Sequence, residues 1–147
     1  MHMKTLLIII LFWSITGVTQ SENNNHSEFD NIVMNAVKKN NYMPVWHAFL
    51  NTTFYVNIIP HNDGEKTKDF EFSVFKTSAT KNEPVVSISE KLERLSHSKS
   101  VTAVTMRGGK LLQLLKPGVG IVIALPEGGF GIPIKQVQWL RASTQSD

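Results

Sequence analysis

The 147-residue sequence contains no cysteine, and it lacks the short motifs that mark several common enzyme classes. An exported protein is free to use disulfides, but this chain cannot form one. Acylation as a lipoprotein is excluded too, because no cysteine follows the apolar N-terminal run. The G-x-S-x-G turn of α/β-hydrolases is missing, and Gly108-Gly109-Lys110 lacks the G-x-x-x-x-G-K-[ST] spacing of a phosphate-binding loop. A turn leading into a helix explains these two glycines better.

The sequence has no large excess of either positive or negative charge. The chain has 15 basic and 12 acidic residues, a net charge of +3. Removal of the first 19 residues would take away Lys4 and no acidic residue, which lowers the net charge to +2. A charge this close to zero argues against nucleic acid as a partner and against strong attraction to anionic lipid.

The sequence has one long hydrophobic run, LLIIILFW at Leu6–Trp13. It follows a short segment that contains Lys4. The run is shorter than the ~20 residues needed to span a bilayer, and its length is typical of a signal-peptide core. Gly17 and Thr19 provide small residues for a cut before Gln20. Residues 1–19 are therefore predicted to be a cleaved signal peptide, with the mature protein in the periplasm or secreted and not stably inserted in the membrane. An uncleaved N-terminal anchor is the alternative.

The rest of the chain is long enough for one domain with its own core. Residues 20–27 (QSENNNHS) are polar and predict a flexible tether, and residues 142–147 predict a polar tail. The domain is expected to cover 28–141.

Hydrophobic periodicity and turn residues predict alternating helices and strands. Ser27 is expected to cap the first helix, Asn40-Asn41 to end it, and Ser89 to cap a later one. The strand at 119–125 is apolar on both faces, which favours a central position, and Gly128-Gly129 predicts a hairpin turn. The expected helices are 28–39, 43–50, 90–95, 110–115 and 135–141, and the expected strands are 52–59, 70–75, 85–86, 101–106, 119–125 and 130–132. This order predicts one α+β domain with a mixed, mainly antiparallel sheet and helices packed on it.

Three blocks of this pattern carry a family resemblance. They are the strand containing Phe54-Tyr55-Val56, the strand-to-helix junction VVSISEKL at Val85–Leu92, and LLKPGVGIVI at Leu114–Ile123. Together with the glycine turn and final helix, the region from about Ile32 to Leu140 resembles the SseB N-terminal domain family. The chain differs from the family after the central strand, where it reads Ala-Leu-Pro, and in its predicted export signal.

The resemblance implies a small bacterial α+β domain whose molecular activity is poorly defined. With no acid/base pair, nucleophile or metal cluster in the sequence, we expect a non-catalytic protein–protein interaction module, of adaptor or immunity type. The partner is expected to be another protein, and neither a cofactor nor a metal is expected.

Aromatic residues are the candidate binding residues. Tyr42, Trp46, Tyr55 and Trp139 could anchor a partner protein, since aromatic side chains are enriched at interfaces. Core packing is the alternative for each of them.

Histidine offers a second hypothesis, a small ligand-binding or hydrolytic protein. His61 and Asp63 are two residues apart, but the same segment, His61–Gly64, has the composition of an exposed turn. His47 lies between Trp46 and Phe49 and is expected to be packed or half-buried.

Overall fold

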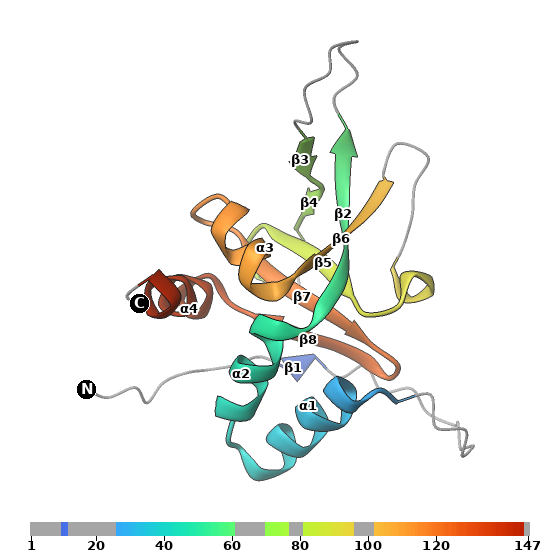
Figure 1. Cartoon of the computed structure of the whole chain (residues 1–147), viewed down its shortest axis with the longest axis vertical. Coiled ribbons are helices and arrows are strands. Elements are labelled where there is room, and N and C mark those ends of the chain that lie inside the picture. Colours follow the sequence, from blue (N-terminus) through green and yellow to red (C-terminus); the bar gives the residue numbers. More distant parts are fainter. Residues whose placement is uncertain (1–9, 12–25, 61–69, 77–80, 96–101, 146–147) are drawn as a thin grey trace.

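The computed structural model describes residues 10–11, 26–60, 70–76, 81–95 and 102–145 (Figure 1). These residues form four α-helices and one open, mixed sheet, a single α+β domain as the sequence predicted. The predicted cleavage site before Gln20, His61 and Asp63 lie outside the described residues, as do most of the predicted signal peptide and tether. No helix within the described ranges is long and apolar enough to cross a membrane.

The sheet is mainly antiparallel. Its strands follow the order β1-β8-β7-β5-β2-β3, while β4 pairs with β5 and β6 pairs with β2. Only β5 and β7 run parallel among the seven strand pairs in the described residues. The strands are β1 (Ile10–Leu11), β2 (Thr53–Pro60), β3 (Phe70–Phe72), β4 (Val74–Phe75), β5 (Val85–Ser89), β6 (Thr102–Arg107), β7 (Gly120–Leu125) and β8 (Gly128–Ile132).

Strand β2 connects two parts of the sheet. Tyr55 and Val56 pair directly with the end of β5, whereas the last residues of β2 pair with β3. Strand β4, which follows β3 after the single residue Ser73, pairs instead with the start of β5. Strand β3 therefore extends the pairing of β2, and β4 extends the pairing of β5, beyond the two residues where β2 and β5 pair with each other. The change of partner at Ser73 explains why apolar and polar residues do not alternate regularly over residues 70–75.

Strand β7 is an interior strand, as predicted, with β5 on one side and β8 on the other. Ile121 and Ile123 are buried, but Val122 on the opposite face is only half-buried. The expectation of a turn at Gly128-Gly129 is wrong. Leu125 pairs with Gly128, so the turn is Pro126-Glu127 and both glycines belong to β8.

The first helix, α1 (Glu28–Lys39), begins and ends at its predicted signals. The Ser27 hydroxyl accepts a hydrogen bond from the Asp30 amide, and the Asp30 carboxylate accepts one from the Ser27 amide. Asn40 ends the helix in the left-handed region, at φ 54°. Helix α2 (Met43–Asn51) carries Pro44 in its first turn, where the missing amide hydrogen costs nothing. The two helices pack side by side against the sheet (Figure 1).

Helix α3 (Gly108–Leu114) starts at the two glycines that were expected to precede it. A Cβ on Gly108 would lie 2.1 Å from the Phe49 carbonyl oxygen, so glycine allows α3 to approach α2 closely. Helix α4 (Ile134–Gln145) begins one residue earlier and ends four residues later than predicted, and most of the predicted polar tail is helical. Arg141 on α4 donates hydrogen bonds to the carbonyls of Leu112 and Leu115, at 2.8 and 2.6 Å.

The prediction of a helix over 90–95 is wrong. Ser89 pairs with Tyr55 as the last residue of β5, and only a short 3-10 turn, η2 (Leu92–Arg94), follows. Leu92 is exposed while Leu95 is buried, so only one of the two residues expected to face inward does so.

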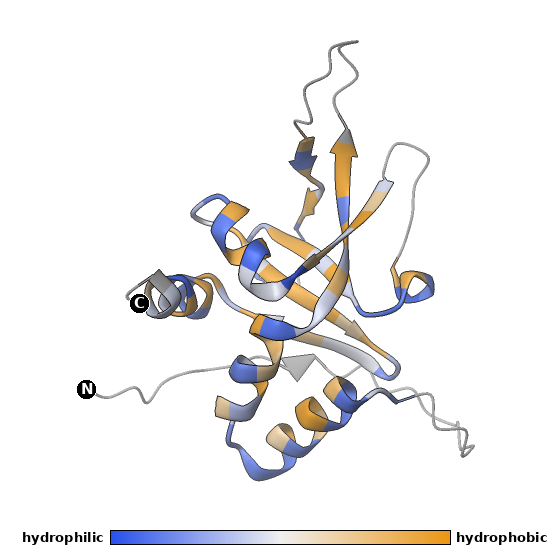
Figure 2. Cartoon of the chain, in the orientation of Figure 1, coloured by the Kyte–Doolittle hydropathy of each residue, from blue (hydrophilic) through white to orange (hydrophobic). Residues whose placement is uncertain are grey.

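One core lies between the sheet and the four helices. Figure 2 shows apolar residues along the strands and on the helix faces that turn toward them. Phe54 packs against the rings of Phe29 and Phe49, with centroids 5.3 and 5.4 Å apart. The fully buried large residues include Val33, Val45, Phe49, Phe54, Val56, Ile88, Leu111, Leu112, Ile121, Ile123, Phe130 and Ile132.

Candidate binding groove

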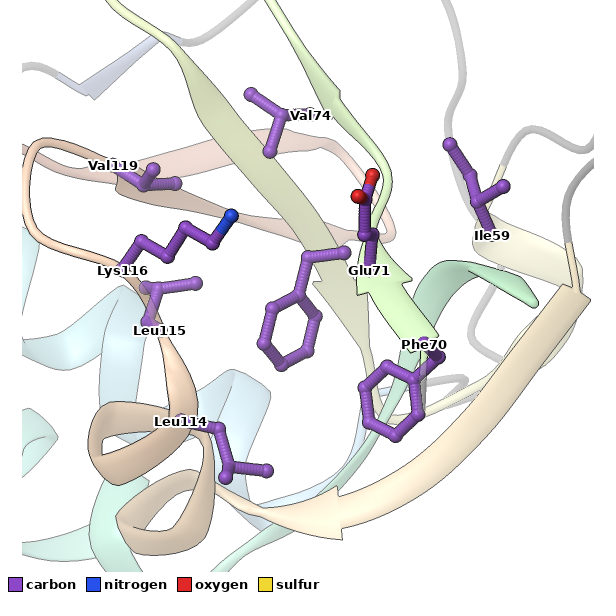
Figure 3. A pocket seen from close by; sticks show the side chains of 9 residues that line it. Ile59, Phe70, Glu71, Val74, Leu114, Leu115, Lys116 and Val119 are labelled. Carbon is purple, nitrogen blue, oxygen red and sulfur yellow. The ribbon is translucent and has the colours of Figure 1, made fainter. Parts of the chain in front are cut away.

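An apolar groove of about 610 Å³ lies between strand β3 and the end of helix α3 (Figure 3). Its volume falls within the range of about 300–1,000 Å³ that is common for ligand sites. We call it the β3–α3 groove. It is lined by Ile59, Phe70, Glu71, Phe72, Val74, Leu114, Leu115, Lys116 and Val119.

The two walls come from segments far apart in the sequence. On one side, Phe70 and Phe72 alternate along β3, and the pairing of Phe72 with Ile58 fixes β3 against β2. On the other side, α3 ends at Leu114, and Leu115 continues into the turn before β7. In Figure 3 the side chains of Leu114 and Leu115 point toward the space that Phe70 also faces.

Several groove side chains stay in contact with solvent despite being apolar. Ile59 is 40% exposed, and Val74 and Leu114 are each 43% exposed. A single exposed apolar residue is ordinary, but a cluster around one recess is typical of an interaction site. Phe75, the other residue of β4, is also exposed but does not line the groove.

The groove has polar groups that can orient a bound molecule. Lys116 is exposed, and its ammonium group extends from the α3 side over the groove, while Glu71 lies on the β3 side (Figure 3). Among the described residues that line the groove, none is a serine, threonine or histidine. In the described parts of the chain, no group of three or more His, Cys, Asp or Glu residues could hold a metal ion. The lining is mostly apolar, which suits the groove to binding apolar groups.

Two of the predicted aromatic residues belong to the core. Trp46 is buried on α2, with its ring 6.3 Å from that of Phe130. Tyr42 is half-buried at the start of the same helix and contacts both rings, at 6.4 Å from Trp46 and 6.0 Å from Phe130. The three rings pack α2 against β8.

The other two aromatic residues are more accessible and lie apart from each other. Tyr55 is half-buried on β2, where it pairs with Ser89 on one side and Thr105 on the other. Trp139 is 44% exposed on α4, next to the buried Leu140. None of the four predicted aromatic residues lines the β3–α3 groove.

Within the described residues, no observation supports the hypothesis of a ligand-binding or hydrolytic site built on histidine. His47 is exposed on α2, so the expectation that it is packed or half-buried is wrong. Helical spacing explains this, because the buried residues Val45, Trp46 and Phe49 lie on the other side of the helix. His61 and Asp63 fall outside the described residues.

The groove is not evident from the sequence, because the residues that line it resemble core residues. Phe70 and Phe72 have the alternation of a half-buried strand, and Leu114-Leu115 has the composition of a helix end that packs inward. The one available signal was the break in alternation after Phe72, which marks the point where the chain stops pairing with β2 and begins to pair with β5.

Comparison with known proteins gives no relative: no family model matches the chain, and neither a curated protein nor a solved structure matches it. The similarity to the SseB N-terminal domain family thus remains a prediction from the residue pattern.

Proposed function

We propose that this protein is an exported, non-catalytic binding module that holds an apolar segment of another protein in the β3–α3 groove. The observation that carries the proposal is the exposure of Ile59, Val74 and Leu114 around one recess. Leaving apolar area in water costs about 25 cal/mol per Å², so a partner that covers these side chains gains that free energy.

A protein segment fits the groove better than a small hydrolytic substrate does. Protein interfaces commonly consist of an apolar centre with a polar rim, and hot-spot side chains fill pockets at that centre. Here the apolar centre is formed by Phe70, Leu114 and Val74, and Lys116 and Glu71 supply the rim. We expect the partner to insert one or two large apolar side chains and to place a carboxylate near Lys116.

Selection from a phage-displayed library of random peptides tests this function. Peptides selected on the full chain should share a large apolar anchor, and they should bind at least tenfold more weakly to Val74→Thr/Leu114→Gln, as measured by calorimetry. Met43→Gln is the matched control, because Met43 is 49% exposed but lies on α2, away from the groove. It should leave peptide affinity unchanged.

Two results would overturn the proposal. One is the absence of any enriched peptide, and the other is equal peptide affinity in the groove variant and the Met43 control. Tight binding of a fatty acid such as laurate, with no peptide enriched, would instead favour the small-ligand alternative. For the hydrolytic version of that alternative, activity lost in His61→Ala and kept in the groove variant would be decisive.

A further inference from the structure

The edge of strand β8 is the second surface of interest, and it lies away from the β3–α3 groove. Strands β8 and β3 are separated by β7, β5 and β2 in the sheet order. One edge of β8 pairs with β7 along its full length. The other edge holds the two-residue strand β1, antiparallel, with Ile10 opposite Phe130 and Leu11 opposite Gly129.

The strand that occupies this edge comes from the apolar run predicted to be an export signal. Cleavage before Gln20 would remove β1 and leave the backbone amides and carbonyls on that edge of β8 without their strand partner. An open edge is a template for pairing with another extended chain. We propose that the β8 edge is a strand-acceptor site, covered in the uncleaved chain by residues 10–11 and, after export, occupied by an extended apolar segment of a partner protein. The exposure step rests on the proposed export.

The residues of β8 define what the incoming strand can carry. Phe130 and Ile132 point into the core, where the rings of Tyr42 and Trp46 pack on Phe130. A residue placed opposite Phe130 shares that face, because directly opposed residues in antiparallel strands lie on the same side of a sheet. An apolar side chain is therefore required there.

The opposite face of β8 is bare. Gly129 and Gly131 alternate with the two core residues, so this face carries no side chains beside the edge. A neighbouring strand can lay large side chains over such glycines, an arrangement known as aromatic rescue. The partner segment should thus alternate an apolar residue opposite Phe130 with large residues opposite Gly129 and Gly131. Residues 6–13, LLIIILFW, have this chemistry throughout.

Disulfide trapping tests the pairing in the full chain, and the absence of native cysteine removes any background. Leu11→Cys/Gly129→Cys should form an intramolecular disulfide under mild oxidation, since the two positions are directly opposed. The control is Leu11→Cys/Thr105→Cys, because Thr105 is exposed on β6, a strand whose only pairing among the described residues is with β2. Equal crosslinking in the two variants, or none in the first, would overturn the assignment of this edge.

Hydrogen exchange on otherwise native protein tests the acceptor role without relying on a cysteine at Gly129. A protease site placed within residues 20–25 allows the full chain to fold before it is cut. Cutting and removal of the N-terminal piece should raise amide exchange in 128–132 at least tenfold. A lysine-tagged peptide with the sequence of residues 6–13 should restore protection.

The matched control is the same peptide with N-methyl groups on its backbone, which keeps the side chains and removes the amide donors. It should restore no protection, and protection by both peptides or by neither would contradict strand pairing. Spontaneous protection of 128–132 together with a doubled molecular mass would make a second copy the occupant and overturn the proposal. Val74→Thr/Leu114→Gln should leave peptide protection unchanged, which keeps this test independent of the groove.

Discussion

Arg94 holds the buried carboxylate of Asp30 with both terminal nitrogens of its guanidinium group. The two nitrogen–oxygen distances are 3.1 and 3.0 Å, and the Asp30 side chain is fully buried. Because the same carboxylate caps α1, this pair ties the first turn of α1 to η2 and, through the Ala124 carbonyl, to the end of β7.

Breaking this ion pair from either side should destabilise the domain strongly. Arg94→Met leaves a buried carboxylate without its cation, and the loss of one partner from a buried pair costs about 3–5 kcal/mol. Urea unfolding measures the change. The double variant Asp30→Ala/Arg94→Met should lose less than the sum of the single variants, because neither charge is then buried alone. Simple additivity would show that the two residues act independently.

Gly108→Ala should be far more destabilising than Gly109→Ala, although the two glycines are adjacent in the first turn of α3. A Cβ at Gly108 would lie 2.1 Å from the Phe49 carbonyl oxygen and 2.9 Å from its carbonyl carbon. At Gly109 the nearest atom, the Leu50 carbonyl oxygen, is 3.4 Å away. Gly109→Ala should change stability by less than about 1 kcal/mol, in keeping with the usual glycine–alanine difference in helices. Thermal unfolding of the two variants checks this, and equal melting temperatures would contradict the close packing of α3 on α2.

Ile121→Ala and Val122→Ala should differ in cost. Ile121 is fully buried, and its truncation should destabilise the domain by about 2–5 kcal/mol. Val122 is half-buried and lies opposite Ser87 and Gly131 on its neighbouring strands. Its truncation should cost about 1 kcal/mol, because much of the lost area is already in water. Urea unfolding again provides the measurement, and equal losses would show that a further element covers the Val122 face.

The proposed export makes a prediction that does not depend on the fold. The intact mass of protein isolated from its native source should correspond to a chain that begins near Gln20 or Ser21, and the protein should be found in the periplasm or the medium. A mass that retains Met1 to Val18, with the protein in the membrane fraction, would support the N-terminal anchor instead.

The ends of α1 could be predicted from the sequence, because they depend on residues close to one another in the chain. Ser27 and Asn40 bound α1 because a hydroxyl cap and a left-handed asparagine act within one turn of the helix. Ser89 offered a similar cap signal, but its pairing with Tyr55 makes it part of β5. Its hydroxyl accepts a hydrogen bond from the Lys91 amide, so the local preference survives in the turn that follows.

The β3–α3 groove could not be predicted from the sequence, because it is formed by segments that are far apart in the chain. Leu114 and Leu115 are adjacent and chemically identical, yet one is 43% exposed and the other 3%. Their difference reflects tertiary packing, because Leu115 belongs to the buried core cluster and Leu114 does not. The positions of aromatic residues did not predict the binding surface either. Trp46 is buried where α2 packs on β8, whereas Trp139 is exposed on the outer side of α4.

The hydrogen bonds from Arg141 to Leu112 and Leu115 have a consequence for biosynthesis. The last carbonyls of a helix have no partner within the helix, and here the donor for two of the carbonyls near the end of α3 comes from α4. During translation Arg141 is added 29 residues after Leu112 and 26 residues after Leu115, so these carbonyls lack this donor until α4 has been made. The end of α3 therefore cannot reach its final hydrogen bonding before α4 has been made and has packed against it.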